Sequence, residues 1–184
     1  IIPTIQDFID RNKVKAFTVV ADAAMISSEN ITQLNQNEIN YIVGARMGNL
    51  SIKLLETVDK QIVRADGKSI RIKTELGYLI CSYSSVRYRK DLYEMNKQIE
   101  KAKQVIQVPS KSKKLKFTTT KDQKLELNDE LIEKTKKLLG IKGYYTNLEE
   151  KIADNQTIIA RYHELYKIEQ AFRVSKSDLQ TRPI

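Results

Sequence analysis

The sequence has one cysteine, one histidine, and no apolar run near the roughly 20 residues that a membrane-spanning helix needs. Cys81 has no second cysteine with which to form a disulfide inside the chain, which is typical of a reducing cytoplasm. It lies in the apolar run 78–81, where we expect a small buried side chain and not a nucleophile. The sequence also has no zinc-ligand spacing, nucleotide-binding glycine loop or nucleophile elbow, and His163 is expected at a helix edge.

Positive charge is abundant and unevenly distributed. The 184 residues are 41% hydrophobic and 30% charged, which indicates a folded core, alone or with an insertion. The formal net charge is +9, and segment 97–142 carries seven of those nine charges. This concentration predicts a basic surface whose counterpart is a polyanion, most simply nucleic acid. A solvated lysine-rich surface that only aids solubility is the alternative interpretation.

The first 45 residues alternate between helical and strand patterns. We expect a helix over 3–11, a buried strand over 16–21, a helix capped by Ser27 or Ser28 and ending near Gln36, and a strand over 39–43 closed by Gly44. This order predicts an α/β core. Asp22 follows the first strand directly, at the carboxyl end, where α/β sheets collect ligand sites. A turn aspartate that caps the next loop is the simpler interpretation of Asp22.

The middle of the chain is basic and rich in predicted strands. We expect helices over 50–58, 90–106 and 131–139, hairpins over 61–73 around Asp66-Gly67 and over 115–127, a basic loop over 108–116, and strands over 78–83 and 142–146. A last long helix is expected from near Leu148. The fold class is therefore α/β at the ends and α+β overall.

Charges interrupt the apolar stripe of that last helix. Ile158, Tyr162, Leu165 and Phe172 follow helical spacing, and Glu169 and Lys176 occupy the remaining positions of the stripe. Because an unpaired buried charge costs several kcal/mol, Glu169 is expected in an ion pair or in a site.

Several segments together resemble a known enzyme family. They are 20–27 with Asn30, 41–46, 83–85 with Arg87 and 90–91, 143–147, and 169–173 with Lys176, Leu179 and 182–184. In this order they resemble the catalytic blocks of DDE transposases of the bacterial insertion-sequence-four family. The resemblance covers both ends of the chain well and the middle only in places. That family's third block has Tyr, Arg, Glu and Lys at fixed spacing, which Tyr162, Glu169 and Lys176 match, whereas Leu165 stands at the Arg position.

The resemblance implies a ribonuclease H-like core with a β-rich insertion before the helix that carries the glutamate. It divides the chain into 1–45 as core, 46–146 as insertion and 147–184 as the core helix. Asp22 and Glu169 would be catalytic and would hold Mg²⁺ or Mn²⁺ for DNA cleavage and strand transfer. Tyr162, Lys176 and Arg173 would contact DNA, with Arg161 or Arg173 replacing the missing arginine. Basic residues of the loop, Lys111, Lys113 and Lys114, would follow phosphates.

The same resemblance places a first catalytic aspartate upstream of Asp22, on a strand absent from these 184 residues. Asp7 and Asp10 lie in a predicted helix and are not assigned this role. We therefore expect an internal piece of a longer protein that cannot cleave or join DNA by itself. Absent neighbouring strands would leave an edge of the strand at Val19 open for pairing. The expected partners are transposon ends, target DNA and a second copy in a synaptic homodimer, in a bacterial cytoplasm at the nucleoid and not at a membrane.

Two other functions remain open from the sequence. One is a non-enzymatic nucleic-acid-binding module with a basic surface over 97–142 and Glu169 in an ordinary ion pair. The other is an assembly module whose charged helix over 90–106 packs on a partner protein. The position of Asp22 relative to Glu169 separates them, because a shared metal pair requires the two carboxylates to converge.

Overall fold

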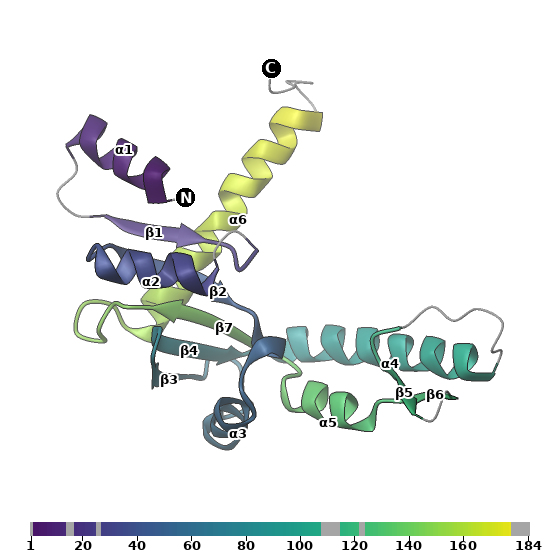
Figure 1. Cartoon of the computed structure of the whole chain (residues 1–184). Coiled ribbons are helices and arrows are strands. Elements are labelled where there is room, and N and C mark those ends of the chain that lie inside the picture. Colours follow the sequence, from purple (N-terminus) through teal and green to yellow (C-terminus); the bar gives the residue numbers. More distant parts are fainter. Residues whose placement is uncertain (1, 14–16, 25–26, 108–114, 122–123, 178–184) are drawn as a thin grey trace. The chain divides into compact units, whose positions relative to one another are not determined.

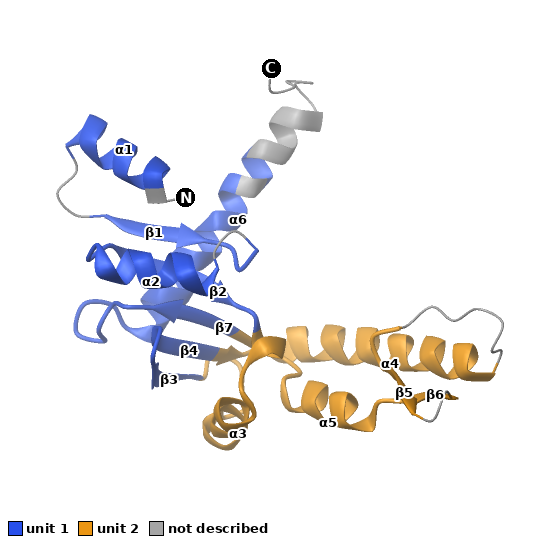
Figure 2. Ribbon diagram, viewed as in Figure 1, with its two compact units in different colours: residues 1–46, 69–81, 143–184 blue, residues 47–68, 82–142 orange. Residues whose placement is uncertain are grey.

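The computed structural model describes residues 2–13, 17–24, 27–107, 115–121 and 124–177; within these, it excludes the side chains of 2, 169 and 172–177. The chain forms two compact units (Figure 2). Unit 1 comprises 1–46, 69–81 and 143–184, and unit 2 comprises 47–68 and 82–142. Residues 69–81, expected in the insertion, therefore belong to the first unit.

Unit 1 is built on a five-stranded mixed sheet (Figure 1). The strand order is β1-β2-β7-β4-β3, which leaves β1 as an edge strand among the described residues. The strands are β1 (Thr18–Ala21), β2 (Asn40–Ala45), β3 (Ser69–Thr74), β4 (Gly77–Tyr83) and β7 (Ile141–Thr146). The helices are α1 (Ile2–Asn12), α2 (Ser28–Gln36) and α6 (Asn155–Ser177). The α/β alternation predicted for the first 45 residues is confirmed, including the side-chain cap of α2 by Ser27.

Alternating side chains of the sheet enter two separate apolar cores. Val19, Tyr41 and Val43 point to the cluster that includes α1 and α2. Val20 and Ile42 point to the cluster that includes α6. Because strand side chains alternate between faces, the sheet has a helical layer on each side.

Strands β1 and β2 are parallel and in register, so their carboxyl ends lie side by side. Thr18 pairs with Asn40 and Ala21 with Val43, so the two strands run together from start to finish. β2 then pairs with β7 in antiparallel register, with Gly44 opposite Tyr144. Strand β2 was expected to close at Gly44, but it continues to Ala45. Asp22 and Gly44 therefore both lie at the carboxyl ends of these two neighbouring strands.

Unit 2 has its own apolar core. Its elements are the 3₁₀ turn η1 (Met47–Asn49), α3 (Ile52–Gln61), α4 (Ser85–Gln107), β5 (Thr118–Lys121), β6 (Lys124–Leu127) and α5 (Asp129–Lys137). Met95 and Ala102 of α4, Phe117 beside β5 and Ile132 of α5 are buried together. The predicted hairpin over 115–127 is confirmed as β5–β6. The predicted basic loop over 108–116 lies mostly outside the described residues.

The hairpin predicted around Asp66-Gly67 is wrong. Residues 62–64 form no strand, and β3 pairs instead with β4. Asp66 is used differently: its carboxylate accepts hydrogen bonds of 2.6 Å from both the backbone N–H and the hydroxyl of Ser85, at the start of α4. These bonds lower the pKa of Asp66. An Asp-Gly turn therefore caps a helix here, and the observed β3–β4 hairpin uses Gly77 at φ 93°.

The last helix begins seven residues later than expected. α6 starts at Asn155, after Asp154 accepts a 2.8 Å hydrogen bond from the N–H of Thr157. Arg71 of β3 binds the segment that precedes α6. Its guanidinium donates to the carbonyls of Leu148 and Ala153 at 2.9 and 2.6 Å, and to the side chain of Asn155 at 3.0 Å. These carbonyls therefore accept hydrogen bonds from an arginine, and not from the backbone N–H groups of a helical turn.

Cys81 is fully buried in β4, as the sequence predicts, and burial raises the pKa of its thiol to about 12. In the described part of the chain, no helix has both the length and the apolar character needed to cross a bilayer.

We predict that Arg71→Ala lowers the free energy of unfolding by roughly 2–3 kcal/mol, since three part-buried oxygens lose a charged donor. Urea denaturation followed by circular dichroism measures this. The matched control is Arg11→Ala, which removes an exposed i,i+4 pair with Asp7 and should cost less than about 0.5 kcal/mol. Equal stability losses in the two variants would contradict the role assigned to Arg71.

Candidate functional site

Asp22 stands at the carboxyl end of β1, on the side of the sheet that α6 covers. It comes two residues after Val20, whose side chain packs in the α6 cluster, and the strand alternation gives both residues the same side. The carboxylate is exposed. Its Oδ1 accepts a 2.6 Å hydrogen bond from the backbone N–H of Ala23. Asp22 thus caps its own turn, as the simpler interpretation predicts, and still presents a carboxylate to solvent.

Tyr162 links α6 to this carboxylate. Its hydroxyl donates to Asp22 Oδ1 at 3.1 Å, across 140 residues of sequence. The ring is 8% exposed and packs edge-on against Tyr144 of β7, with ring centroids 4.8 Å apart. The tyrosine is therefore held by its ring, and its hydroxyl fixes the position of Asp22. The expected DNA contact of Tyr162 stays a prediction.

Gly44 makes this approach of α6 to the sheet possible. A Cβ atom at this position would lie 2.5 Å from the Tyr162 hydroxyl oxygen and 3.2 Å from the backbone nitrogen of Ala23. Real Cβ atoms essentially never come within 3.0 Å of another heavy atom, and a contact of 3.2 Å is already tight. Any larger residue at position 44 must therefore displace the hydroxyl that holds Asp22.

His163 lies on the exposed side of α6, as its position off the stripe predicts. Its Nε2 is 3.2 Å from the hydroxyl of Tyr144. Tyr144 therefore contacts both Tyr162 and His163, which ties two consecutive residues of α6 to β7.

Glu169 can be placed by the backbone of α6, although its side chain lies outside the described residues. α6 is helical from Asn155 to Ser177. Seven residues are close to two turns, so Glu169 shares the face of Tyr162 and lies about 10 Å further along the axis. Lys176 follows one heptad later on that face. The side chains of Arg173 and Lys176, and all of Lys111, Lys113 and Lys114, are also outside the described residues.

The described half of the expected metal site has the right donor chemistry. Both hydrogen bonds to Asp22 end on Oδ1, and Oδ2 accepts none from a described residue. A fixed, exposed carboxylate oxygen is the ligand type that Mg²⁺ and Mn²⁺ prefer. Among the side chains that the structure describes, no three His, Cys, Asp or Glu residues are grouped to hold a metal ion. The side chain of Glu169, the second expected ligand, lies outside this described set.

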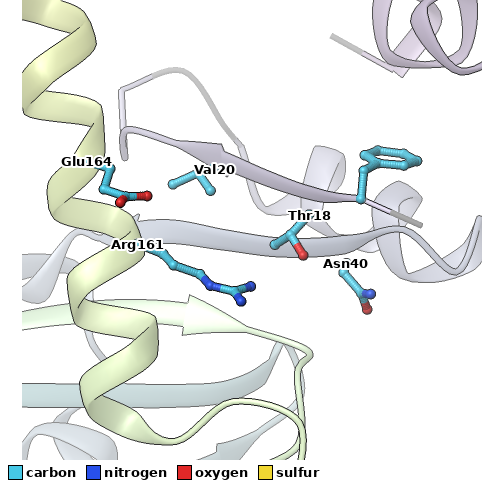
Figure 3. A pocket seen from close by; sticks show the side chains of 6 residues that line it. Thr18, Val20, Asn40, Arg161 and Glu164 are labelled. Carbon is cyan, nitrogen blue, oxygen red and sulfur yellow. The ribbon is translucent and has the colours of Figure 1, made fainter. Parts of the chain in front are cut away.

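Leu165 stands at the arginine position of the family signature, and Arg161 is one of its two expected replacements. Leu165 packs in the α6 cluster. Arg161 lines an open pocket of about 430 Å³ together with Glu164, Thr18 and Asn40 (Figure 3). Val20 also lines this pocket, which therefore runs along β1 from its start to two residues before Asp22.

Two residues of the site are missed by sequence reasoning. Gly44 was expected only to end a strand, and Tyr144 only to form one. The alternation along β7 is the signal that was available for Tyr144, since it places that ring on the α6 side. No signal in the sequence shows that the space beside Gly44 is filled by a tyrosine 118 positions away.

Comparisons with protein-family models, with curated proteins and with solved structures find no match for this chain. The assignment of the site therefore depends on its residues and geometry.

We predict that Gly44→Ala lowers the free energy of unfolding by about 1–3 kcal/mol, because the added methyl overlaps the Tyr162 hydroxyl. Gly48→Ala is the matched control, since a Cβ there meets nothing within 4 Å. The control should change stability by less than about 0.5 kcal/mol in urea denaturation.

A double-mutant cycle with Tyr162→Phe tests the cause. Removing the hydroxyl should cost less stability in the Gly44→Ala background than in the wild type, since the methyl has already displaced it. Additive losses would show that the methyl acts elsewhere.

Proposed function

We propose that this chain is part of the catalytic core of a DNA transposase. In this proposal the core is ribonuclease H-like, and Asp22 and Glu169 bind divalent cations at the site of DNA cleavage and strand transfer. Lys176, on the same face of α6, contacts the DNA backbone.

The layout of unit 1 supports this proposal. Strands β1 and β2 are separated in sequence from β7 and α6 by unit 2, which begins directly after β2 and is itself interrupted by the segment 69–81. The resemblance leads to the same expectation of a core interrupted before the helix that carries the glutamate. Residues 69–81 differ from it by joining the sheet of the core.

The single observation that carries the proposal is the Tyr162–Asp22 hydrogen bond of 3.1 Å. It brings the face of α6 that bears Tyr162 to the carboxyl end of β1. Glu169 lies on that same face, two turns later. If α6 had turned this face elsewhere, Asp22 and Glu169 would belong to different surfaces.

The residues present would prepare a carboxylate site. The Ala23 N–H and the Tyr162 hydroxyl hold Oδ1 of Asp22, which leaves Oδ2 for a ligand. The buried Tyr162 ring restricts where its hydroxyl can lie. Glu169 would supply the second carboxylate from α6. Bound Mg²⁺ or Mn²⁺ would supply an activated water nucleophile and stabilise the leaving oxygen of the phosphodiester.

A non-enzymatic nucleic-acid-binding module is the second candidate. It is favoured by the net charge, since segment 97–142 carries seven of the nine excess positive charges and lies within unit 2. Both candidates bind a polyanion. Only the first requires a divalent cation between Asp22 and Glu169.

We predict that Fe²⁺ with ascorbate, used in place of Mg²⁺, cleaves the protein backbone at two places. Radicals form at the bound iron, so the cuts should fall near residue 22 and between 165 and 172. Mass spectrometry of the fragments measures both. Asp22→Asn and Glu169→Gln should each remove both cuts, because each variant loses one of two shared ligands.

Asp10→Asn is the matched control, since it neutralises an exposed carboxylate of α1. Its fragments should equal those of the wild type, and excess Mg²⁺ should suppress them. Cuts that persist in both site variants, or no cut at either segment in the wild type, would contradict the shared metal site.

A further inference from the structure

One exposed stripe of α4 carries three lysines and a tyrosine. Lys90, Tyr93, Lys97 and Lys101 are spaced by three, four and four residues, which places them on one side of the helix. The opposite side, through Met95 and Ala102, is buried in the core of unit 2. All four residues of the stripe are exposed, and Tyr93 is 64% exposed. We call these four residues the α4 stripe.

The charge of the α4 stripe is not neutralised by its own helix. Of the three acidic residues of α4, Asp91 pairs with Arg87 and Glu100 pairs with Lys103. Glu94 lies on the same side of α4, four residues after Lys90 and three before Lys97, but no lysine of the stripe forms an ion pair with it or with another described residue. The stripe therefore presents three ammonium groups over about 16 Å of helix.

Tyr93 lies among these charges as an open aromatic surface. The ammonium of Lys97 is 5.9 Å from the centre of its ring. Proteins that bind single-stranded nucleic acids combine exposed aromatic rings with basic side chains. The ring stacks on a base, and the ammonium groups neutralise adjacent phosphates. Inside a duplex both faces of a base are covered by the neighbouring base pairs, so stacking on Tyr93 requires a base with an open face, as in a single strand.

We propose that the α4 stripe binds single-stranded nucleic acid, with Tyr93 stacked on an unpaired base and Lys90, Lys97 and Lys101 at phosphates. This assignment goes beyond the proposed function, because it needs neither Asp22 nor Glu169. A membrane surface fits less well. A helix that lies in a bilayer inserts an apolar face, and the apolar face of α4 is already buried in unit 2.

The test is fluorescence anisotropy with a labelled single-stranded oligonucleotide and its duplex, in EDTA and over a series of salt concentrations. Replacing all three stripe lysines by Gln should weaken binding and reduce the salt slope by about two, at about 0.7 per lost phosphate contact. Tyr93→Leu should weaken single-strand binding about tenfold. Tyr93→Phe, which keeps the ring, should bind as the wild type does.

The charge-matched control replaces Lys53, Lys60 and Lys73 by Gln, all of them exposed and outside α4. It should retain the wild-type salt slope. Equal losses in the two triple variants would overturn the proposal, as would equal effects of Tyr93→Leu on single strand and duplex. A stripe variant that loses binding only to vesicles of anionic lipid would assign the surface to a membrane instead. Because EDTA removes divalent cations, a negative result in this binding assay does not bear on the proposed Asp22–Glu169 metal site. In the same way, the iron-cleavage result does not bear on the α4 stripe.

Discussion

The arrangement of unit 1 depends on the close approach of α6 to the ends of β1 and β2. Gly44 provides the space, because a Cβ atom there would meet the Tyr162 hydroxyl at 2.5 Å. Tyr144 packs edge-on against the Tyr162 ring, and the hydroxyl of that ring reaches Asp22. An exposed aspartate in a loop becomes a positioned carboxylate through contacts with residues that carry no charge. The chemistry proposed for Asp22 follows from this packing.

The start of α6 is positioned by polar contacts at the other end of the sheet. Arg71 binds the chain before the helix, and Thr146 donates to the carbonyl of Tyr41 at 2.6 Å inside the core. Asn147 completes the connection, accepting from the N–H of Tyr41 and donating to the carbonyl of Ile39. Segment 143–147, which carries part of the family resemblance, therefore has a structural role, because it aligns β7 with β2 and fixes where α6 can begin.

Local patterns predict the elements well and their partners less well. Ser27 as a cap, the strand before Asp22 and the buried Cys81 follow from short-range chemistry, and the structure agrees. Asp66-Gly67 misled because the Asp66 carboxylate binds Ser85, 19 residues away, in preference to closing a hairpin. The start of α6 was predicted too early because Arg71, which binds the chain before the helix, comes from a distant strand. For the site, the roles predicted for Asp22 and Tyr162 come from the family resemblance, whereas Gly44 and Tyr144 act through contacts that only the folded chain creates.

The proposed metal site depends most on one convergence, that of the Asp22 and Glu169 carboxylates. A crystal of the chain soaked in Mn²⁺ measures it directly through the anomalous signal of the metal. We expect a Mn²⁺ peak with one oxygen of each carboxylate at about 2.0–2.3 Å, and with Asp22 Oδ1 still bound to Tyr162. A Glu169 carboxylate in an ion pair with an arginine or lysine, with no Mn²⁺ at Asp22, would contradict the shared site.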